Sequence, residues 1–435
     1  MYKKFKILIS VIFLGITVFS CGTKNSKDEV VTIKYWSFPN FNADSELKTP
    51  EEFDMALIKA FEEANPDIKV EYQKIDFTDG PAKLETSIIS KSNPDVIIDA
   101  PGRVIDWAKK GYLVPFDIDT SIYSNTIVSA ASHEGKLYLY PLGTAPFVMA
   151  FNKVITDKLG LTHMLPLDRE GRNWTVEEFE ALLMAIKEKD PSIDPIIFFN
   201  KTPDGSHGSR SFVLNLFDTW LTDKDITKYI VNNERGVKGL EWAKKAHDMG
   251  LLGDGASSEA RDALEAFRSG LAAGTMIYSP GLNAISSNQQ AKAEGRLDPV
   301  YVAMPNNGGQ AKYELLLAGA AVFNNNDEAK IEASKKFVDF VINDPVWGQR
   351  ALKATRNFSP IGKTGLYGDD EETKFIENIN SNGNYGPYYN TIDGFAQMRP
   401  LWSNMVQAVL NGQISPKAGL NKFVIDATKA MEDAK

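Results

Sequence analysis

The sequence predicts an α/β fold built on an open, mainly parallel sheet, because short apolar runs alternate with longer helical periods from the N-terminal part onward. Residues 31–36 alternate in polarity and are rich in β-branched and aromatic side chains, as expected for a strand. Further strands are predicted at 68–72 and 94–99, with helices between them at 53–64 and 83–90. Strands separated by helices pair in parallel, and ligands of such sheets bind at the carboxyl ends of the strands.

The rest of the chain continues this alternation, and a second α/β region is predicted from Phe147 onward. Thr175, followed by Glu178 three residues later, predicts a capping box at the start of a helix. A strand-like run at 136–141 is interrupted by glycine and proline at 143–146. The other predicted elements are helices at 103–110, 209–219, 234–249, 260–268 and 327–342 and strands at 273–278, 299–303 and 315–323, of which 315–323 and 327–342 return to the first sheet.

The composition excludes several classes of function. The 435 residues include 48 basic and 57 acidic side chains, a net charge of −9, so the basic excess that nucleic-acid binding requires is missing. The single cysteine cannot form an internal disulfide, and four scattered histidines without a Cys-x-x-Cys pair cannot build a closed zinc site. We therefore expect no nucleic-acid partner, no essential metal and no cofactor.

The N-terminus has the features of an export signal. A cationic start is followed by an apolar run at 7–19 that is too short to be a permanent membrane span. Ser20 then precedes Cys21, an arrangement that resembles a bacterial lipoprotein signal, in which cleavage leaves an acylated Cys21 as the new N-terminus. We expect a signal peptide at 1–20 and a polar tether at 21–29; the alternative is a secretory peptide cut nearby, with an incidental cysteine.

A series of motifs follows the signal in a distinctive order: FEEANPDIKV (61–70), NPDVI (93–97), GYLVPF (111–116), WTVEEFEALL (174–183), FRSGLAAGTMIYSPG (267–281) and ISPKAGLNKF (414–423). Together they resemble extracellular solute-binding protein family 1, the carbohydrate-binding lipoproteins of ABC importers that include the maltose-binding proteins. The resemblance implies a type II periplasmic-binding-protein fold with two α/β lobes and a ligand cleft between them.

The same resemblance implies the lobe boundaries. The N-terminal lobe is expected at 30–142 plus 316–359, and the C-terminal lobe at 143–315 plus 360–435. Stretches interrupted by proline or glycine fall where the chain should cross between the lobes, at 141–146, 305–309 and 360–365. Hinge bending at these crossings would close the lobes on the ligand.

The resemblance also implies the function. We expect an exported monomer, held on the outer face of the membrane by acylated Cys21, that captures a carbohydrate and delivers it unchanged to a membrane permease. Two alternatives remain at this point: a lipid-anchored glycoside hydrolase or lyase, for which paired carboxylates are available, and a structural adhesin. Against an enzyme, the sequence has no Gly-x-Ser-x-Gly, His-Glu-x-x-His or Gly-x-Gly-x-x-Gly motif.

Sugar recognition needs aromatic platforms and planar hydrogen-bonding side chains, and the first candidates follow predicted strand ends. Trp36 and Phe38 could stack on a sugar or cap the core, and Asp99 with Arg103 could bind a ligand or close a turn as an ion pair. Thr144 follows a crossing strand and could face the ligand.

Further candidates come from the second half of the chain. Arg210 is expected beside free N–H donors at the start of a helix, unless it pairs with an acid such as Asp218. Tyr388 lies in an aromatic turn, and Tyr278 stands near a position where relatives often carry a tryptophan. By resemblance Trp402 is a stacking ring. Three arginines near the cleft, Arg103, Arg210 and Arg399, would also suit an acidic sugar such as a sialic acid or a uronic-acid disaccharide, whereas Trp107, Trp174 and Trp242 are expected in the core.

Overall fold

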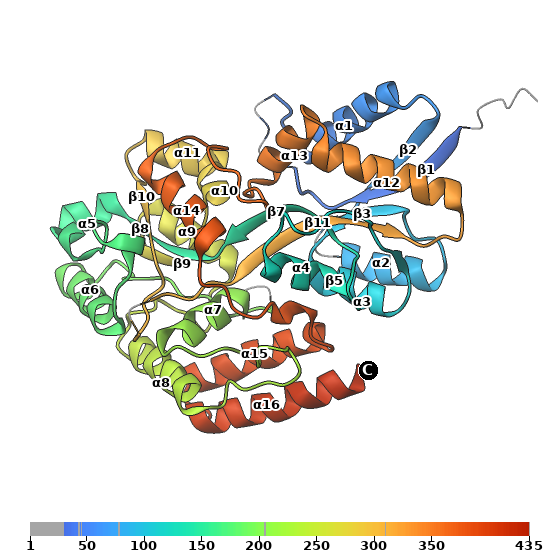
Figure 1. The fold of residues 1–435 in the computed structure, drawn as a ribbon. Helices are drawn as coiled ribbons and strands as arrows, with labels where there is room; N and C mark the ends of the chain where they lie inside the picture. Colours follow the sequence, from blue (N-terminus) through green and yellow to red (C-terminus); the bar gives the residue numbers. More distant parts are fainter. Residues whose placement is uncertain are drawn as a thin grey trace, which may run out of the picture.

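The computed structural model describes residues 30–41, 44, 46–76, 79–203, 206–308 and 310–434. The predicted signal peptide, the tether and Cys21 lie outside the described residues. Two α/β units make up the molecule, each with its own sheet and hydrophobic core (Figure 1). None of the helices in the described part of the chain combines the length and the apolar character that crossing a bilayer demands.

The first sheet confirms the predicted parallel arrangement. Its strand order is β2 (Ile68–Lys74), β1 (Val31–Ser37), β3 (Val96–Asp99), β11 (Leu315–Phe323) and β4 (Leu113–Val114), and β7 (Tyr140–Pro146) also pairs with β11. β1 pairs in parallel with β2 and β3, whereas β11 returns antiparallel to β3. The elements around this sheet are α1 (Pro50–Ala64), α2 (Gly80–Ile89), α3 (Pro101–Lys109), α4 (Asn125–Ala131), β5 (Ser132–His133), β6 (Lys136–Leu137), α12 (Glu328–Asn343) and α13 (Trp347–Thr355).

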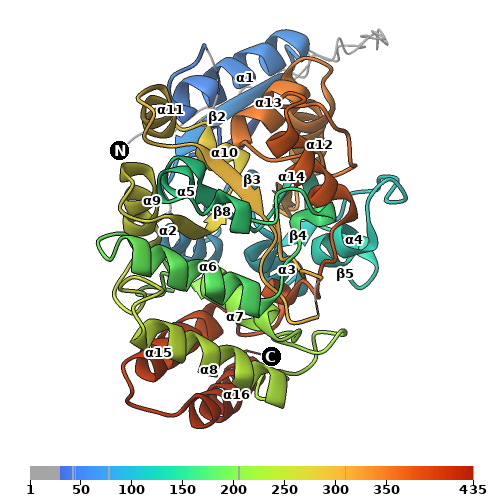
Figure 2. The same ribbon diagram turned by 90° about the vertical axis from the view of Figure 1, so that its left-hand side faces the viewer.

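The second unit surrounds an antiparallel sheet in the order β10 (Pro299–Val302), β8 (Val148–Asn152) and β9 (Gly274–Tyr278). In the rotated view, α8, α15 and α16 gather at the end of this unit that lies far from α1, α12 and α13 (Figure 2). Its helices are α5 (Lys153–Leu159), η1 (Thr162–Met164), η2 (Glu170–Arg172), α6 (Val176–Lys189), α7 (Ser206–Leu216), α8 (Glu234–Asp248), α9 (Ala260–Ser269), α10 (Pro280–Asn283), α11 (Ser286–Ala293), α14 (Glu371–Asn382), η3 (Tyr389–Thr391), α15 (Phe395–Leu410) and α16 (Pro416–Asp433).

Three chain segments lie side by side where the two units meet. β7 leads through Phe147 into β8, and β11 runs antiparallel to β7 from the second unit into the first sheet. The third segment contains Phe358, whose amide donates to the Thr144 carbonyl at 2.7 Å, while the Thr144 amide donates back at 2.9 Å. The connections between the units are therefore hydrogen-bonded to one another: two are paired strands, and the third meets β7 through a single bridge at Thr144 and Phe358.

One prediction about this region is wrong. Glycine and proline at 143–146 were expected to interrupt the strand, yet β7 continues through them to Pro146. β7 keeps β11 as its neighbour along this length and meets the third segment only at Thr144, and proline is tolerated in a strand with one partner. Gly143 fits because the third segment is close: a Cβ here would lie 2.7 Å from the Cβ of Asn357.

Local sequence signals explain several boundaries. The capping box predicted at Thr175 and Glu178 is present, and α1 ends at Ala64, just before Asn65 and Pro66, because a residue preceding proline avoids the helical conformation. The core positions predicted from helical spacing are confirmed, since the exposed fractions of Trp107, Trp174 and Trp242 are 0%, 2% and 7%.

A buried carboxyl group lies behind β1. The Tyr35 hydroxyl donates to Oδ1 of Asp54 at 3.0 Å, and the Tyr72 hydroxyl donates to Oδ2 at 3.2 Å. The Asp54 residue is completely shielded from solvent. Burial, opposed only in part by hydrogen bonds from Ser37, Tyr35 and Tyr72, raises the pKa of Asp54 to about 7.

We predict that this group makes the folded state less stable at alkaline pH. An unfolded aspartate titrates near 3.9, so the stabilisation from Asp54 is fully present below about pH 4 and is lost as the pH rises through about 7, by up to about 4 kcal/mol. Asp54→Asn removes this titration. In urea unfolding at about pH 5 and about pH 8, the free energy of unfolding should fall less in the variant than in the wild type; an equal fall would contradict the prediction.

Candidate functional site

The carboxyl ends of β1 and β3 bring three predicted residues together. Arg103 donates from Nε to Oδ2 of Asp99 at 2.6 Å and from Nη2 to Oδ1 at 2.5 Å, so the two side chains form a bidentate ion pair. The Arg103 guanidinium also lies 5.4 Å from the centre of the Phe38 ring. Trp36 is 7% exposed, and the Lys83 amine is 5.3 Å from the centre of its ring.

The segment between α14 and α15 closes against this end of the first unit. Gly102 in α3 lies so near the Asn390 carbonyl that a Cβ would come within 2.9 Å of its oxygen. The Lys109 amine pairs with Asp393 at 2.5 Å. The turn around Tyr388 therefore packs directly against the strand ends of the first unit, and Tyr388 itself belongs to the buried core of that unit.

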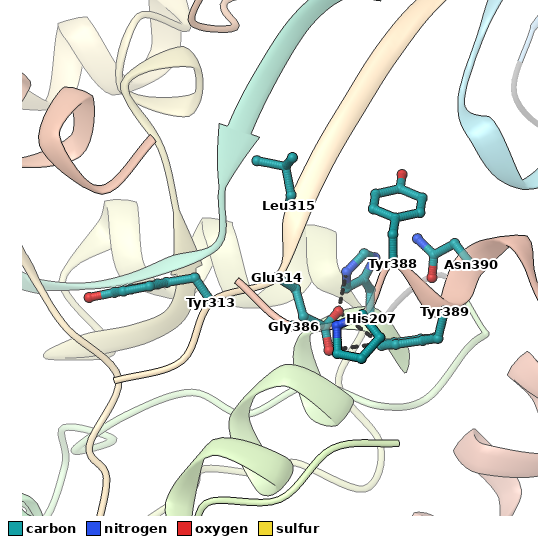
Figure 3. Close-up of a pocket in the computed structure, with 9 residues that line it drawn as sticks. His207, Tyr313, Glu314, Leu315, Gly386, Tyr388, Tyr389 and Asn390 are labelled. Carbon is teal, nitrogen blue, oxygen red and sulfur yellow. Dashed lines mark hydrogen bonds and ion pairs between the residues drawn. The ribbon is translucent and has the colours of Figure 1, made fainter. Parts of the chain in front are cut away.

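A buried polar network crosses the same region. Arg210 donates from Nε to the Tyr389 hydroxyl at 2.9 Å, and this hydroxyl donates in turn to Oε1 of Glu314 at 2.7 Å. His207 Nε2 lies 2.5 Å from the other carboxylate oxygen. Figure 3 shows Glu314 between His207 and Tyr389, with these contacts drawn as dashed lines. One chain of contacts thus joins α7, η3 and the residue that precedes β11.

The chemistry of the network follows from its burial. Burial raises the pKa of Tyr389 well above its usual range, although the Arg210 charge acts in the opposite direction. The hydroxyl therefore stays protonated and can donate to Glu314. Arg210 is 0% exposed and also donates from Nη1 to the Ser206 hydroxyl at 2.7 Å. The cation and the carboxylate are held at fixed positions by groups from separate elements.

A small pocket lies beside this network, and two buried polar atoms near it have no hydrogen-bond partner among the described residues. These atoms are Oδ1 of Asn390, which lines the pocket, and Nη2 of Arg210. One is an acceptor and the other a donor, and a hydroxyl group can satisfy either kind. The residues that line the pocket are His207, Tyr313, Glu314, Leu315, Gly386, Pro387, Tyr388, Tyr389 and Asn390.

The position of Arg210 differs from the sequence-based expectation. α7 begins at Ser206, so Arg210 lies in the second turn and not beside the free N–H groups of the first. Nor does it pair with Asp218, which forms ion pairs with Arg235 at 2.9 Å and Lys312 at 2.6 Å. The predicted helix began at residue 209, whereas α7 begins at Ser206 and includes Gly208, which packs against Ile277 and Phe199.

Four other predicted site residues lie away from the pocket. The Thr144 hydroxyl donates to Asn380 Oδ1 at 2.8 Å within the crossing segments. Tyr278 is fully buried, and its hydroxyl accepts from Asn288 at 3.1 Å. Arg399 donates from Nη2 to the Pro203 carbonyl at 3.1 Å.

Trp402, the fourth, is 0% exposed and packs edge-on against Phe423. Its indole N–H donates to the Ser209 hydroxyl at 2.9 Å. The ring therefore presents no free face in this conformation, and its visible role is to pack α15 against α7 and α16.

We accordingly predict a large effect of Trp402→Ala on stability. Removing a fully buried aromatic ring costs about 3–5 kcal/mol, because the cavity cannot fully collapse. Trp347→Ala is the matched control, since that tryptophan is only partly buried. Chemical unfolding should show the larger loss for Trp402→Ala, and equal losses would contradict a core role.

Sequence reasoning missed Glu314 and His207. Glu314 directly precedes the strand predicted to return to the first sheet, so its place at a crossing was the available signal. His207 lies in a Gly/Ser-rich run before a predicted helix, with no motif to distinguish it. In the described ranges, no cluster of three or more His, Cys, Asp or Glu side chains could hold a metal ion.

Two α/β units joined by neighbouring strands, with aromatic and polar side chains where they meet, define a two-lobed binding protein of the periplasmic maltose-binding type. Residues 45–346 match the family model described as "Bacterial extracellular solute-binding protein". The chain belongs to this family, and the predicted two-lobed fold is confirmed. Its known members and structural neighbours are solute-binding proteins of ABC transporters that include sugar binders, and they work outside the cytoplasmic membrane.

Individual relatives are distant in sequence. A relative named "Putative binding protein BAB2_0491", from Brucella abortus (strain 2308), is 24% identical over 384 residues, which cover 83% of this chain and 85% of the relative. A solute-binding protein from Thermotoga lettingae bound with alpha-D-tagatose has a TM-score of 0.75 at 19% identity, covering 92% of this chain and 100% of that one. The sugar-binding protein MalE from Xanthomonas citri has a TM-score of 0.73 at 18% identity, with coverages of 93% and 98%.

Proposed function

We propose that this protein captures a carbohydrate between its two lobes and delivers it unchanged to the permease of an ABC importer. The observation that carries the proposal is the buried network of Arg210, Tyr389 and Glu314 beside Oδ1 of Asn390, a buried acceptor with no partner among the described residues. Fixed donors and acceptors next to aromatic rings suit the hydroxyl rim and the apolar faces of a sugar. Neighbours of the same fold bind tagatose, cycloalternan and acarbose, which supports this class of ligand.

We propose further that the sugar is neutral. Arg103 already has a bidentate partner in Asp99, and Arg210 is linked to Glu314 through one tyrosine hydroxyl. Each cation therefore has a carboxylate nearby, so an additional acid on the ligand would lack a free partner. An acidic sugar, such as a sialic acid or a uronic-acid disaccharide, is the alternative that the ligand screen decides.

The mechanism combines hinge closure with membrane anchoring. We propose that lobes at 30–142 plus 316–359 and at 143–315 plus 360–435 rotate about the paired strands β7 and β11. Ligand binding would then stabilise the closed form by mass action. Acylation of Cys21 would hold the mature protein, a monomer, on the outer face of the membrane, where several acyl chains provide stable attachment.

A ligand screen tests this function. Thermal unfolding with neutral oligosaccharides, monosaccharides and acidic sugars should show stabilisation by neutral sugars, and calorimetry should then give saturable binding. Analysis of the sugar afterwards should recover it intact. Release of a cleavage product would favour the enzyme alternative, and the absence of binding to every sugar would overturn the proposal.

A variant pair locates the binding site. Asn390→Ala removes the buried Oδ1 acceptor and should weaken sugar binding by about 1–2 kcal/mol, the value of a hydrogen bond to a buried group. Asn382→Ala is the control, because Asn382 is exposed at the end of α14. Calorimetry should separate the two variants; equal affinities would remove Asn390 from the site.

A further inference from the structure

We propose that the end of the first lobe opposite the ligand site is a membrane-contacting surface that binds anionic lipid headgroups. We call this surface the basic pole and define it by Lys34, Lys91, Lys330, Ile89 and Tyr112. The inference rests on the proposed lipid anchor, because an anchored body presents one side to the bilayer. β1 begins at the right-hand end of the molecule in Figure 1, where the β11–α12 loop also lies.

An open groove of about 510 Å³ lies at this end. Lys34, Lys91 and Lys330 line it, from β1, the α2–β3 turn and α12. The groove is built on a hydrogen-bonded frame. Asp95 accepts from the Lys34 amide at 2.7 Å and from the Asn325 side chain at 2.5 Å. Asp95 thus ties the backbone at Lys34 to the loop that precedes α12.

The charges of the groove are unbalanced in favour of cations. None of the three lysine amines has a carboxylate within salt-bridge distance in the part of the chain that the structure describes. Two carboxylates also line the groove: Asp95, which is 5% exposed and accepts two hydrogen bonds, and Asp327, which caps α12. Three lysines against two aspartates leave the lining with a net charge of +1. The whole chain carries a charge of −9, so an anionic bilayer repels most of its surface and attracts this end.

Exposed apolar side chains accompany the lysines. Ile89, the last residue of α2, is 82% exposed, and Tyr112 in the groove wall is 41% exposed. Lysine next to exposed aliphatic and tyrosine side chains is the composition of a surface that lies at a lipid–water interface.

The tether places the basic pole near the bilayer. Residues 21–29 span at most about 30 Å when fully extended, and Val30 is about 13 Å along β1 from Lys34. The candidate ligand site lies past the other end of the same strand, at Trp36 and Phe38. Contact at the basic pole would therefore leave the space between the lobes open to sugar.

The first experiment uses the mature chain from residue 21 with Cys21→Ser, which carries no acyl group. All core residues of both lobes lie between Ile33 and Met431, so this chain retains both cores. It should co-sediment with phosphatidylglycerol vesicles and not with phosphatidylcholine vesicles. Lys34→Glu, Lys91→Glu and Lys330→Glu together should reduce binding at least tenfold.

A matched variant carries the same charge change on the second lobe: Lys292→Glu, Lys417→Glu and Lys429→Glu, three exposed lysines. This control variant should bind anionic vesicles at least tenfold more strongly than the triple variant of the basic pole. Equal loss in both variants, equal binding to neutral vesicles, or no binding would overturn the inference. Sugar affinity is measured on the same samples, so a failure here with sugar binding retained leaves the proposed function intact.

A second measurement tests orientation in the anchored protein. The chain has one cysteine, so acylation of Cys21 leaves no other thiol for labelling. Ile89→Cys and Ile425→Cys introduce single thiols at positions that are 82% and 69% exposed, the second on α16. A dye at position 89 should be quenched by quencher-labelled headgroups, and a dye at 425 should not. Equal quenching would show that the anchored protein has no preferred face.

Discussion

Replacing Arg210 with alanine will lower the free energy of unfolding by about 3–5 kcal/mol and abolish measurable sugar binding. The side chain is fully buried and forms the cationic end of the network through Tyr389 to Glu314. Removing it takes a fully buried cation out of the network and leaves the hydroxyls of Tyr389 and Ser206 without the guanidinium donors from which they accept. Urea unfolding and calorimetry measure the two effects.

The control for this prediction is Arg261→Ala, which truncates an arginine whose side chain is 83% exposed and should change stability by less than about 0.5 kcal/mol. Tyr389→Phe tests the bridging hydroxyl separately from the charges, because it removes this hydroxyl and leaves Arg210 and Glu314 in place. Its expected cost is about 1–2 kcal/mol. If Arg210→Ala behaved like the control, the network would have no energetic role.

Replacing Gly319 with alanine should destabilise the junction of the lobes by about 2–3 kcal/mol, the usual cost of forcing extra volume into a packed site. A Cβ at this position would lie 2.4 Å from the Tyr140 carbonyl oxygen and 2.6 Å from a methyl group of Leu139. β11 shifts register against β7 between Ala318 and Gly319, so this residue lies where the two connecting strands adjust to each other.

Small-angle scattering with and without sugar tests whether Gly319→Ala still closes on its ligand. A distorted strand pair should reduce the compaction that the ligand induces. Leu316→Ala, on the same strand and 37% exposed, is the control and should compact normally. Wild-type stability and compaction in Gly319→Ala would show that closure does not depend on this strand pair.

Much of the fold could be predicted from the sequence, because strands and helix ends are specified by local patterns of residues. Alternating polarity at 31–36 and 68–72 predicts two strands that the structure pairs in parallel, and the capping box at Thr175 sets the start of α6. The continuation of β7 through Pro146 could not be predicted from the sequence. Proline disfavours a strand locally, and only the arrangement of its neighbours removes the penalty.

The site was harder to predict from the sequence, because its contacts join residues far apart in the chain. Tyr389 lies 75 positions from Glu314 and 179 from Arg210. The sequence indicated Arg210 and the aromatic turn, but it could not say which acid completes the network. Trp402 shows the same limit, since helical spacing does not distinguish a ring that faces a ligand from one that packs in the core.

A crystal structure of the protein grown with the most stabilising sugar tests the central claim most directly. We predict one intact sugar between the lobes, touching Asn390, Tyr388 and the ends of β1 and β3. A sugar bound only on an outer face, or a cleaved product between the lobes, would contradict capture and delivery of an unchanged carbohydrate.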